Sequence, residues 1–193
     1  MLRIAALLMS LAAAPALAHQ PVLISGQDYP AGAPYEIEEP EISKAIFAEL
    51  PGRPHYYRID SPAPFRFYAG ITVPKIDGCP LAATFSLDVL DADFRPILTA
   101  DGETFDWWPW YEEYGKKWYW VGPEIGADFK ADREFEAGTY YIRVYNEKNS
   151  GQYVLAVGDI ESFPIGVIAR TIFTMPVINR EFWDEATCAA AQQ

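Results

Sequence analysis

Residues 138–158 constrain the fold more than any other part of this sequence. Apolar side chains alternate with other residues in two runs, as in strands with one buried face. The alternating residues are Tyr140, Ile142 and Val144, and then Tyr153, Leu155 and Val157. A polar loop with Asn and Gly separates the runs, which predicts an antiparallel hairpin. Because an isolated hairpin is unstable in water, further strands must supply a second layer.

Four other segments show the same period of two, and turns rich in Pro, Gly and Asp separate them. These segments are residues 55–59, 65–73, 83–89 and 95–99. Residues 42–50 instead carry apolar side chains at helical spacing, and a Pro-Gly pair follows them. We therefore predict an all-β fold: an antiparallel, jelly-roll-like β-sandwich with one short N-terminal helix.

Residues 1–18 are expected to be an export signal. Arg3 provides the positive start, an apolar run follows, and residues 16–18 have the small-x-small pattern that a signal peptidase recognises. Cleavage after Ala18 would leave 175 of the 193 residues, enough for one domain. We expect the remainder to consist of an extended arm at 19–40, the sandwich at 41–160 and a C-terminal tail packed on it at 161–193.

The expected mature chain is strongly acidic: 14 Lys and Arg against 27 Asp and Glu give a net charge of −13. Such a surface repels nucleic acid and anionic membrane surfaces, so we expect neither as a partner. The most apolar later stretch, residues 163–178, is interrupted by Arg170 and Pro176 and is shorter than the roughly 20 residues that a membrane span needs. These features predict an exported protein of the periplasm or the extracellular space.

Cys79 and Cys188 could form one disulfide in an oxidising compartment. The bond would connect the C-terminal tail to the loop before a central strand. Because the sequence does not show whether the two backbones come close enough, paired and free cysteines both stay open.

Two segments resemble the last strands of bacterial pre-peptidase C-terminal (PPC-like) domains. FEAGTYYIRV at 135–144 and SGQYVL at 150–155 are similar to that family's aliphatic-Gly-x-Tyr strand and its Gly-x-Tyr-x-Leu strand, and YYRI at 56–59 resembles its opening strand. The resemblance covers residues 42–158 in order and is specific over residues 135–158. It implies a jelly-roll-like β-sandwich and a non-catalytic module that aids secretion or binds polymers. The aromatic insert described next departs from the family pattern, as does the lack of an attached peptidase.

This insert, residues 103–121, contains five of the six tryptophans of the chain. Its candidate ligand-binding residues are Trp107, Trp108, Trp110, Tyr111, Trp118 and Trp120. Aromatic rings beside carboxylates suit stacking on sugar rings, and Trp and Tyr are also enriched in protein-docking hot spots. The third interpretation is structural, with the tryptophans closing an open end of the sandwich. The sequence leaves these three interpretations open.

His19 would become the N-terminal residue after cleavage of the signal. Its amine and ring, together with the ring of His55, could supply the three nitrogens of a copper-binding histidine brace. Copper-dependent polysaccharide monooxygenases, which are also β-sandwiches, use this arrangement. The alternative is coincidence, because some residue must follow the cleavage site and an aromatic residue is ordinary where His55 lies.

Two groups of acidic residues lie in expected loops, where carboxylates can bind calcium. They are Asp88, Asp91 and Asp93, and Asp101, Glu103 and Asp106. Neither group has the EF-hand spacing, and Asp is common in turns for its backbone hydrogen bonds, so turn chemistry is the preferred interpretation.

Nucleophilic catalysis has little support in the sequence. No Gly-x-Ser-x-Gly elbow surrounds Ser25, and the adjacent Glu112 and Glu113 would point to opposite faces of a strand. We therefore predict an exported, non-catalytic binding module that recognises a cell-envelope protein or a glycan through its Trp-rich insert. The alternative prediction is a periplasmic or secreted copper-binding protein that uses His19 and His55.

Overall fold

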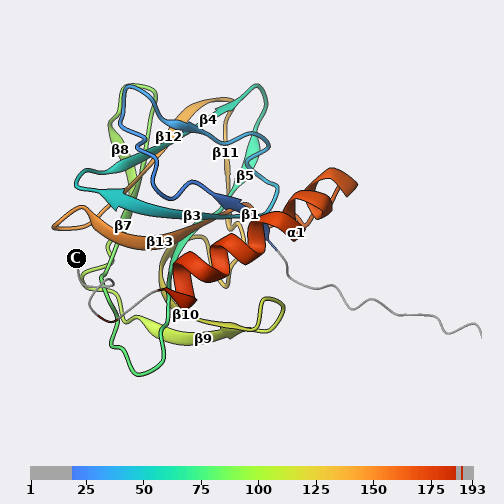
Figure 1. The fold of residues 1–193 in the computed structure, drawn as a ribbon. Helices are drawn as coiled ribbons and strands as arrows, with labels where there is room; N and C mark the ends of the chain where they lie inside the picture. Colours follow the sequence, from blue (N-terminus) through green and yellow to red (C-terminus); the bar gives the residue numbers. More distant parts are fainter. Residues whose placement is uncertain (1–18, 186–187, 189–193) are drawn as a thin grey trace, which may run out of the picture.

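The computed structural model describes residues 19–185 and residue 188, so the expected export signal lies outside the described residues. The described chain is mostly β, with mixed sheets and one α-helix that crosses the larger sheet (Figure 1). The predicted predominance of strands is therefore confirmed.

The larger sheet has six strands in the order β1-β3-β13-β6-β10-β9. β1 and β3 run parallel, and the other neighbours run antiparallel. The strands are β1 (Gln20–Leu23), β3 (Lys44–Pro51), β6 (Ala69–Pro74), β9 (Trp108–Glu112), β10 (Lys117–Ile125) and β13 (Ser150–Val157).

The second sheet has five strands in the order β2-β4-β12-β7-β8, with β2 and β4 parallel. Its strands are β2 (Tyr35–Glu36), β4 (His55–Ser61), β7 (Ser86–Leu90), β8 (Pro96–Ala100) and β12 (Gly138–Tyr145). Two short strands, β5 (Phe65–Phe67) and β11 (Arg133–Phe135), pair separately.

One core contains apolar side chains from both larger sheets. Ile59, Leu87 and Ile142 come from the five-stranded sheet, and Ile46 and Leu155 come from the six-stranded sheet. All five side chains are fully buried. The burial of this shared interior is the main favourable contribution to the stability of the fold.

The two strands predicted at 138–158 exist, but the prediction that they pair as a hairpin is wrong. β12 pairs with β4 and β7, whereas β13 pairs with β3 and β6 in the other sheet. In the loop between them, the Asn146 Nδ2 atom donates to the Ser150 carbonyl at 2.8 Å, and the Ser150 N–H donates to the Asn146 Oδ1 atom at 3.2 Å. A period of two specifies which face is buried and does not specify the neighbouring strand.

The predicted helix at 42–50 is also wrong, because this segment forms β3. Ile46 and Leu50 point into the shared core, as alternating strand residues do. Phe47, on the opposite face, is also buried, against Phe182 near the C-terminus. Apolar residues on both faces hide the period of two and produce the helical spacing seen in the sequence.

The two ends of the described chain are more ordered than predicted. The expected arm at 19–40 contributes β1 and β2 to the two sheets. The expected tail contains the helix α1 (Ile165–Asn179) and a turn of π-helix, η1 (Arg180–Asp184). No helix in the described part of the chain is long and apolar enough to cross a membrane.

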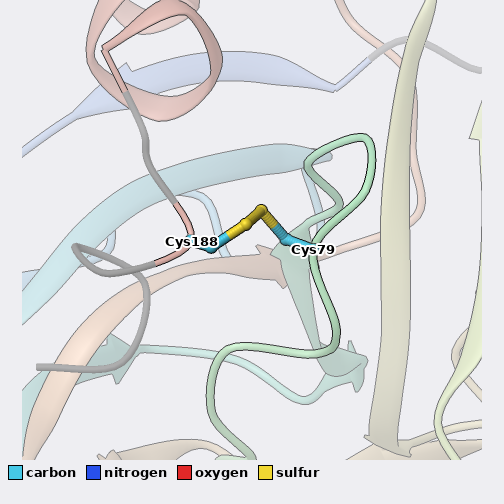
Figure 2. The surroundings of a disulfide bond; sticks show 2 residues. All are labelled: Cys79 and Cys188. Carbon is cyan, nitrogen blue, oxygen red and sulfur yellow. A yellow bond between two sulfur atoms is a disulfide. The ribbon is translucent and has the colours of Figure 1, made fainter.

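Cys79 and Cys188 form a disulfide, with their Cα atoms 5.3 Å apart. The bond connects the loop after β6 to the segment that follows η1 (Figure 2). Of the two alternatives that the sequence left open, the structure therefore has the paired one.

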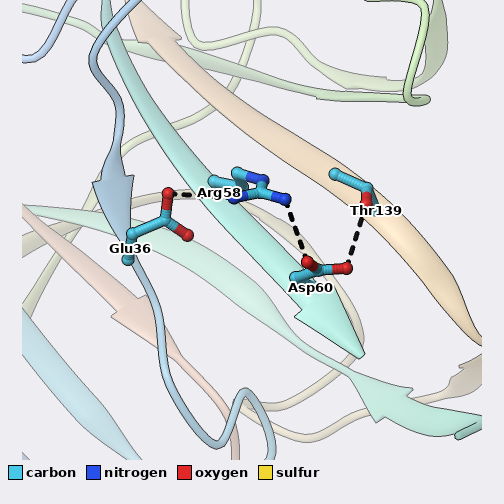
Figure 3. A network of polar contacts seen from close by, with 4 residues as sticks. All are labelled: Glu36, Arg58, Asp60 and Thr139. Atoms are coloured by element: carbon cyan, nitrogen blue, oxygen red, sulfur yellow. Dashed lines mark hydrogen bonds and ion pairs between the residues drawn. The ribbon is translucent and has the colours of Figure 1, made fainter. Parts of the chain in front are cut away.

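A polar network connects three strands of the five-stranded sheet (Figure 3). Arg58 contacts Glu36 at 3.3 Å and Asp60 at 2.9 Å, and the Thr139 hydroxyl donates to Asp60 at 3.0 Å. These exposed contacts contribute little to stability, but they show that this part of the sheet presents a polar face to solvent. The six-stranded sheet has a different outer face, which is largely apolar.

Candidate functional site

Four neighbouring strands of the six-stranded sheet place small residues side by side. The register pairs Pro21 with Ala45, Ala45 with Ala156, and Ala156 with Gly70. We call these four residues the small-residue row. None of their side chains has more than three carbon atoms, so the side chains of this row project only a short distance from the outer face of the sheet.

The next row along the same face is large. Val154 pairs with Phe47, and both are buried beneath Ile178 and Phe182 from the C-terminal segment. The Phe47 and Phe182 rings meet edge to face with 5.1 Å between their centroids. Because Ile178 and Phe182 are fully buried, this contact fixes the C-terminal end of α1 on the sheet.

The result is a groove of about 520 Å³ between α1 and the sheet. The small-residue row forms its floor, and Ile168, Ile172 and Met175 of α1 form one wall. The short side chains of the row leave room for this groove beneath the helix. Its volume lies within the range of about 300–1,000 Å³ that is common for small-molecule sites.

The opposite wall comes from the hairpin of β9 and β10, which carries the Trp-rich insert. Trp110 pairs with Tyr119, and Glu112 pairs with Lys117, so these four side chains share the face that lines the groove. Phe129 stacks on the Trp110 ring with 5.3 Å between centroids. One face of the insert is therefore part of the groove.

Few polar groups reach the apolar part of the groove. At the β1 end, the His19 Nδ1 atom is hydrogen-bonded to the Ser43 hydroxyl. Burial, and next the Lys130 ammonium, lower the pKa of His19 to about 4, so the ring is neutral at pH 7. On α1, the Asn179 Oδ1 atom is buried and has no hydrogen-bond partner among the described residues. It is an acceptor that a donor group of a ligand could satisfy.

The aromatic candidates of the insert do not form one cluster. Trp107 and Trp120 pack against the core, and the Trp107 Nε1 atom donates to the Gly102 carbonyl at 2.8 Å. Trp110 lines the groove. Two of these tryptophans thus contact the core, whereas the third lines a cavity.

The other three candidates, Trp108, Tyr111 and Trp118, are exposed. Tyr111 and Trp118 form a cross-strand pair with their ring centroids 5.2 Å apart. The Lys75 ammonium lies 5.6 Å from the Trp118 ring. Because neighbouring residues on a strand point to opposite faces, this pair lies on the side of the hairpin away from the groove.

His19 and His55 lie apart from one another in the structure. His55 is fully buried in the core, and its Nδ1 atom lies 2.9 Å from the Tyr153 hydroxyl. Tyr153 pairs with Ala48, whereas His19 contacts Ser43, five residues earlier. At about 3.3 Å per residue, these positions are about 16 Å apart along β3. The two rings of the predicted copper site are therefore not neighbours, and no cluster of three or more His, Cys, Asp or Glu suited to a metal occurs among the described residues.

Three of the six acidic residues considered for calcium have other hydrogen-bond partners. Asp91 and Asp101 each accept, through Oδ1, the backbone N–H of the residue two positions later, at 2.9 and 3.0 Å. Asp88 is buried and accepts hydrogen bonds from Thr99 at 2.7 Å and from Arg143 Nε at 2.9 Å. Turn chemistry accounts for Asp91 and Asp101, and an ion pair accounts for Asp88.

The sequence interpretation missed the floor and the helical wall of the groove. The floor depends on the register between strands far apart in the sequence, which no local pattern reveals. The wall had a local signal, because Ile165, Ile168 and Ile172 recur at the spacing of one helix face. Pro176 and the single charge of Arg170 concealed that signal.

Comparison with known proteins provides no family for this chain. No family model matches it, and no curated protein matches it. Among solved structures, it is similar to a β-glucosidase from Paenibacillus barengoltzii, at 11% identity and a TM-score of 0.26. The match covers 76% of this chain but 14% of the β-glucosidase chain. Because the TM-score and the identity are so low, no function of the β-glucosidase is transferred to this chain.

Proposed function

We propose that this protein is an exported, non-catalytic binding module and that the groove between α1 and the six-stranded sheet is its ligand site. The construction of the groove carries this proposal. Its floor consists of short side chains. Trp110 and Tyr119 form one wall, and Ile168 and Ile172 form the other. Ligand sites typically combine such an apolar lining with a few polar groups that orient the ligand.

We further propose that the two larger sheets form a jelly-roll-like β-sandwich of the PPC-like kind, on which the groove is held rigid. Residues of both sheets share one core, which supports this architecture. The predicted export signal and the disulfide between Cys79 and Cys188 support a location in the periplasm or outside the cell.

The ligand proposed for this groove is an apolar segment of a cell-envelope protein. The aromatic and aliphatic walls have the composition of protein-docking hot spots. The unpartnered Asn179 Oδ1 atom offers one buried acceptor for an N–H or O–H group of the partner. Because this acceptor is already buried without a donor in the free protein, a donor group of the partner would remove a penalty of about 1–3 kcal/mol.

The test is to fill the groove from its floor. Ala156 is buried beneath the groove but belongs to neither apolar cluster of the interior, so Ala156→Phe should occupy the groove while the fold stays intact. An environment-sensitive naphthylamine dye should bind the wild type, and Ala156→Phe should weaken its binding at least tenfold, or about 1.4 kcal/mol. Ala92→Phe, at an exposed turn position, is the matched control and should bind like the wild type. Equal dye binding by Ala156→Phe and the wild type would refute the proposal.

Glycan recognition is a second candidate, favoured by the exposed pair of Tyr111 and Trp118. Exposed aromatic faces suit the apolar side of sugar rings. If this surface binds a glycan, Trp118→Ala should weaken retention on a glycan array and leave the melting temperature unchanged. A lower melting temperature with unchanged retention would assign Trp118 to the support of the hairpin.

A further inference from the structure

α1 carries an apolar stripe that nothing in the described chain covers. The stripe consists of Ile165, Ile168 and Ile172, and it continues into Met175, which packs on the cluster around Phe47. Ile165, Ile168 and Ile172 expose 85%, 50% and 65% of their surface. Large apolar side chains that are exposed together are uncommon on soluble proteins and mark interaction sites.

The spacing of the stripe is the one by which helices pair. Its residues follow one another at i, i+3, i+7 and i+10, and three of the four are isoleucine. Apolar residues at this spacing form the seam between two helices in coiled coils and in complexes where a helix binds a groove. Because Ile168 and Ile172 also line the groove, the stripe and the groove form one continuous surface.

Charge indicates which kind of helix fits this surface. Six ionised side chains line the groove: Glu112, Glu124, Asp159 and Glu161, and Lys117 and Lys130. The Asp159 side chain is buried and forms an ion pair with Arg66 at 2.9 Å, so three carboxylates and two ammonium groups remain to face a ligand. The whole chain carries a net charge of −12. A second copy would bring the same negative charge to the contact, whereas a helix with basic residues would be attracted to it.

We propose that the groove and the stripe together bind an amphipathic helix of a partner protein, with one apolar face and Lys or Arg beside it. The partner helix would lie along α1, with its apolar side chains inserted over the small-residue row. This inference rests on the proposed function and adds the chemistry of the partner. The basic residues would face the carboxylates at the rim of the groove.

Two synthetic helical peptides test the inference with the full chain. Both have 18 residues and the same Leu stripe, but one carries Lys on its polar face and the other carries Glu. Fluorescence anisotropy should show that the Lys peptide binds at least tenfold more tightly than the Glu peptide. The Lys peptide should also displace the naphthylamine dye from the groove.

Variants of the stripe separate apolar docking from simple charge attraction. Ile165→Ser combined with Ile172→Ser should weaken binding of the Lys peptide at least tenfold. The exposed Ile97 on β8 provides the matched control, so Ile97→Ser should bind like the wild type. The buried Ile178 and Phe182 anchor the other end of α1, so the stripe variants should keep the helical signal in circular dichroism.

The outcomes distinguish this inference from the proposed function. If the Lys peptide does not bind while the dye binds in a groove-dependent way, the inference fails and the proposed function stands. If the dye binds Ala156→Phe as tightly as it binds the wild type, the proposed function fails. Equal binding of the Lys peptide to the stripe variant and to the wild type would overturn the inference, because charge alone would explain it. Self-association that the stripe variant abolishes would assign the surface to a second copy and also overturn it.

Discussion

Removal of the disulfide should lower the free energy of unfolding by several kcal/mol. Cys79 and Cys188 are 109 positions apart, so the bond closes a very long loop in the unfolded chain. For a loop of this length, the chain-entropy relation gives a stabilisation of about 4.8 kcal/mol at 25 °C. The bond therefore acts mainly by restricting the unfolded state, and the contacts of the folded state should survive its removal.

Guanidinium unfolding, followed by tryptophan fluorescence, measures this effect in a double variant, Cys79→Ser with Cys188→Ser. With a denaturant slope of about 4 kcal/mol/M, the predicted loss lowers the midpoint by about 1.2 M. The reduced wild type is the control and should unfold at the same midpoint as the variant. Without denaturant, the variant should still bind the naphthylamine dye, because Ile178 and Phe182 hold α1 independently of the bond. A midpoint shift below about 0.3 M would refute the entropic reasoning.

Three further predictions concern buried groups. Burial lowers the pKa of His55, so the unfolded chain takes up a proton that the folded chain excludes, and stability should decrease as the pH falls below about 6.5. In urea unfolding at pH 7.5 and pH 5, His55→Gln should lose less stability than the wild type; an equal loss would contradict this. Asp88→Asn should destabilise the fold by about 2–4 kcal/mol in thermal unfolding, because Arg143 loses its buried carboxylate. A Cβ on Gly102 would lie 1.8 Å from the Phe85 carbonyl oxygen, so Gly102→Ala should cost about 1–3 kcal/mol. An unchanged melting temperature would show that the loop at Gly102 can move aside.

The strands could be predicted from the sequence because alternation is a local property. Residues such as Ile142 and Val144 point inward whatever strand lies beside them, so the β-rich fold followed from their spacing. The pairing of those strands is not local. It depends on which segments cover the same interior. The turn before Ser150 connects the two sheets, although the same alternating pattern would also fit a hairpin within one sheet.

The candidate site was predicted in part. The Trp-rich insert does contribute to the groove, through Trp110, but composition could not show that Trp107 and Trp120 turn toward the core. The two faces of a strand differ only in what covers them, and this is decided by distant parts of the chain. For the same reason, the pairing of Ala45 with Ala156 could not be read from either segment alone.

The small-residue row has a consequence for the depth of the groove. Ala156 lies on the outer side of the sheet and belongs to neither apolar cluster, whereas Ala45 packs against the cluster around Phe47. Replacing Ala156 with Val or Leu would add two or three carbon atoms to the floor and leave both clusters as they are. The depth of this recess could thus be adjusted through one side chain, without a change in the residues that hold the two sheets together.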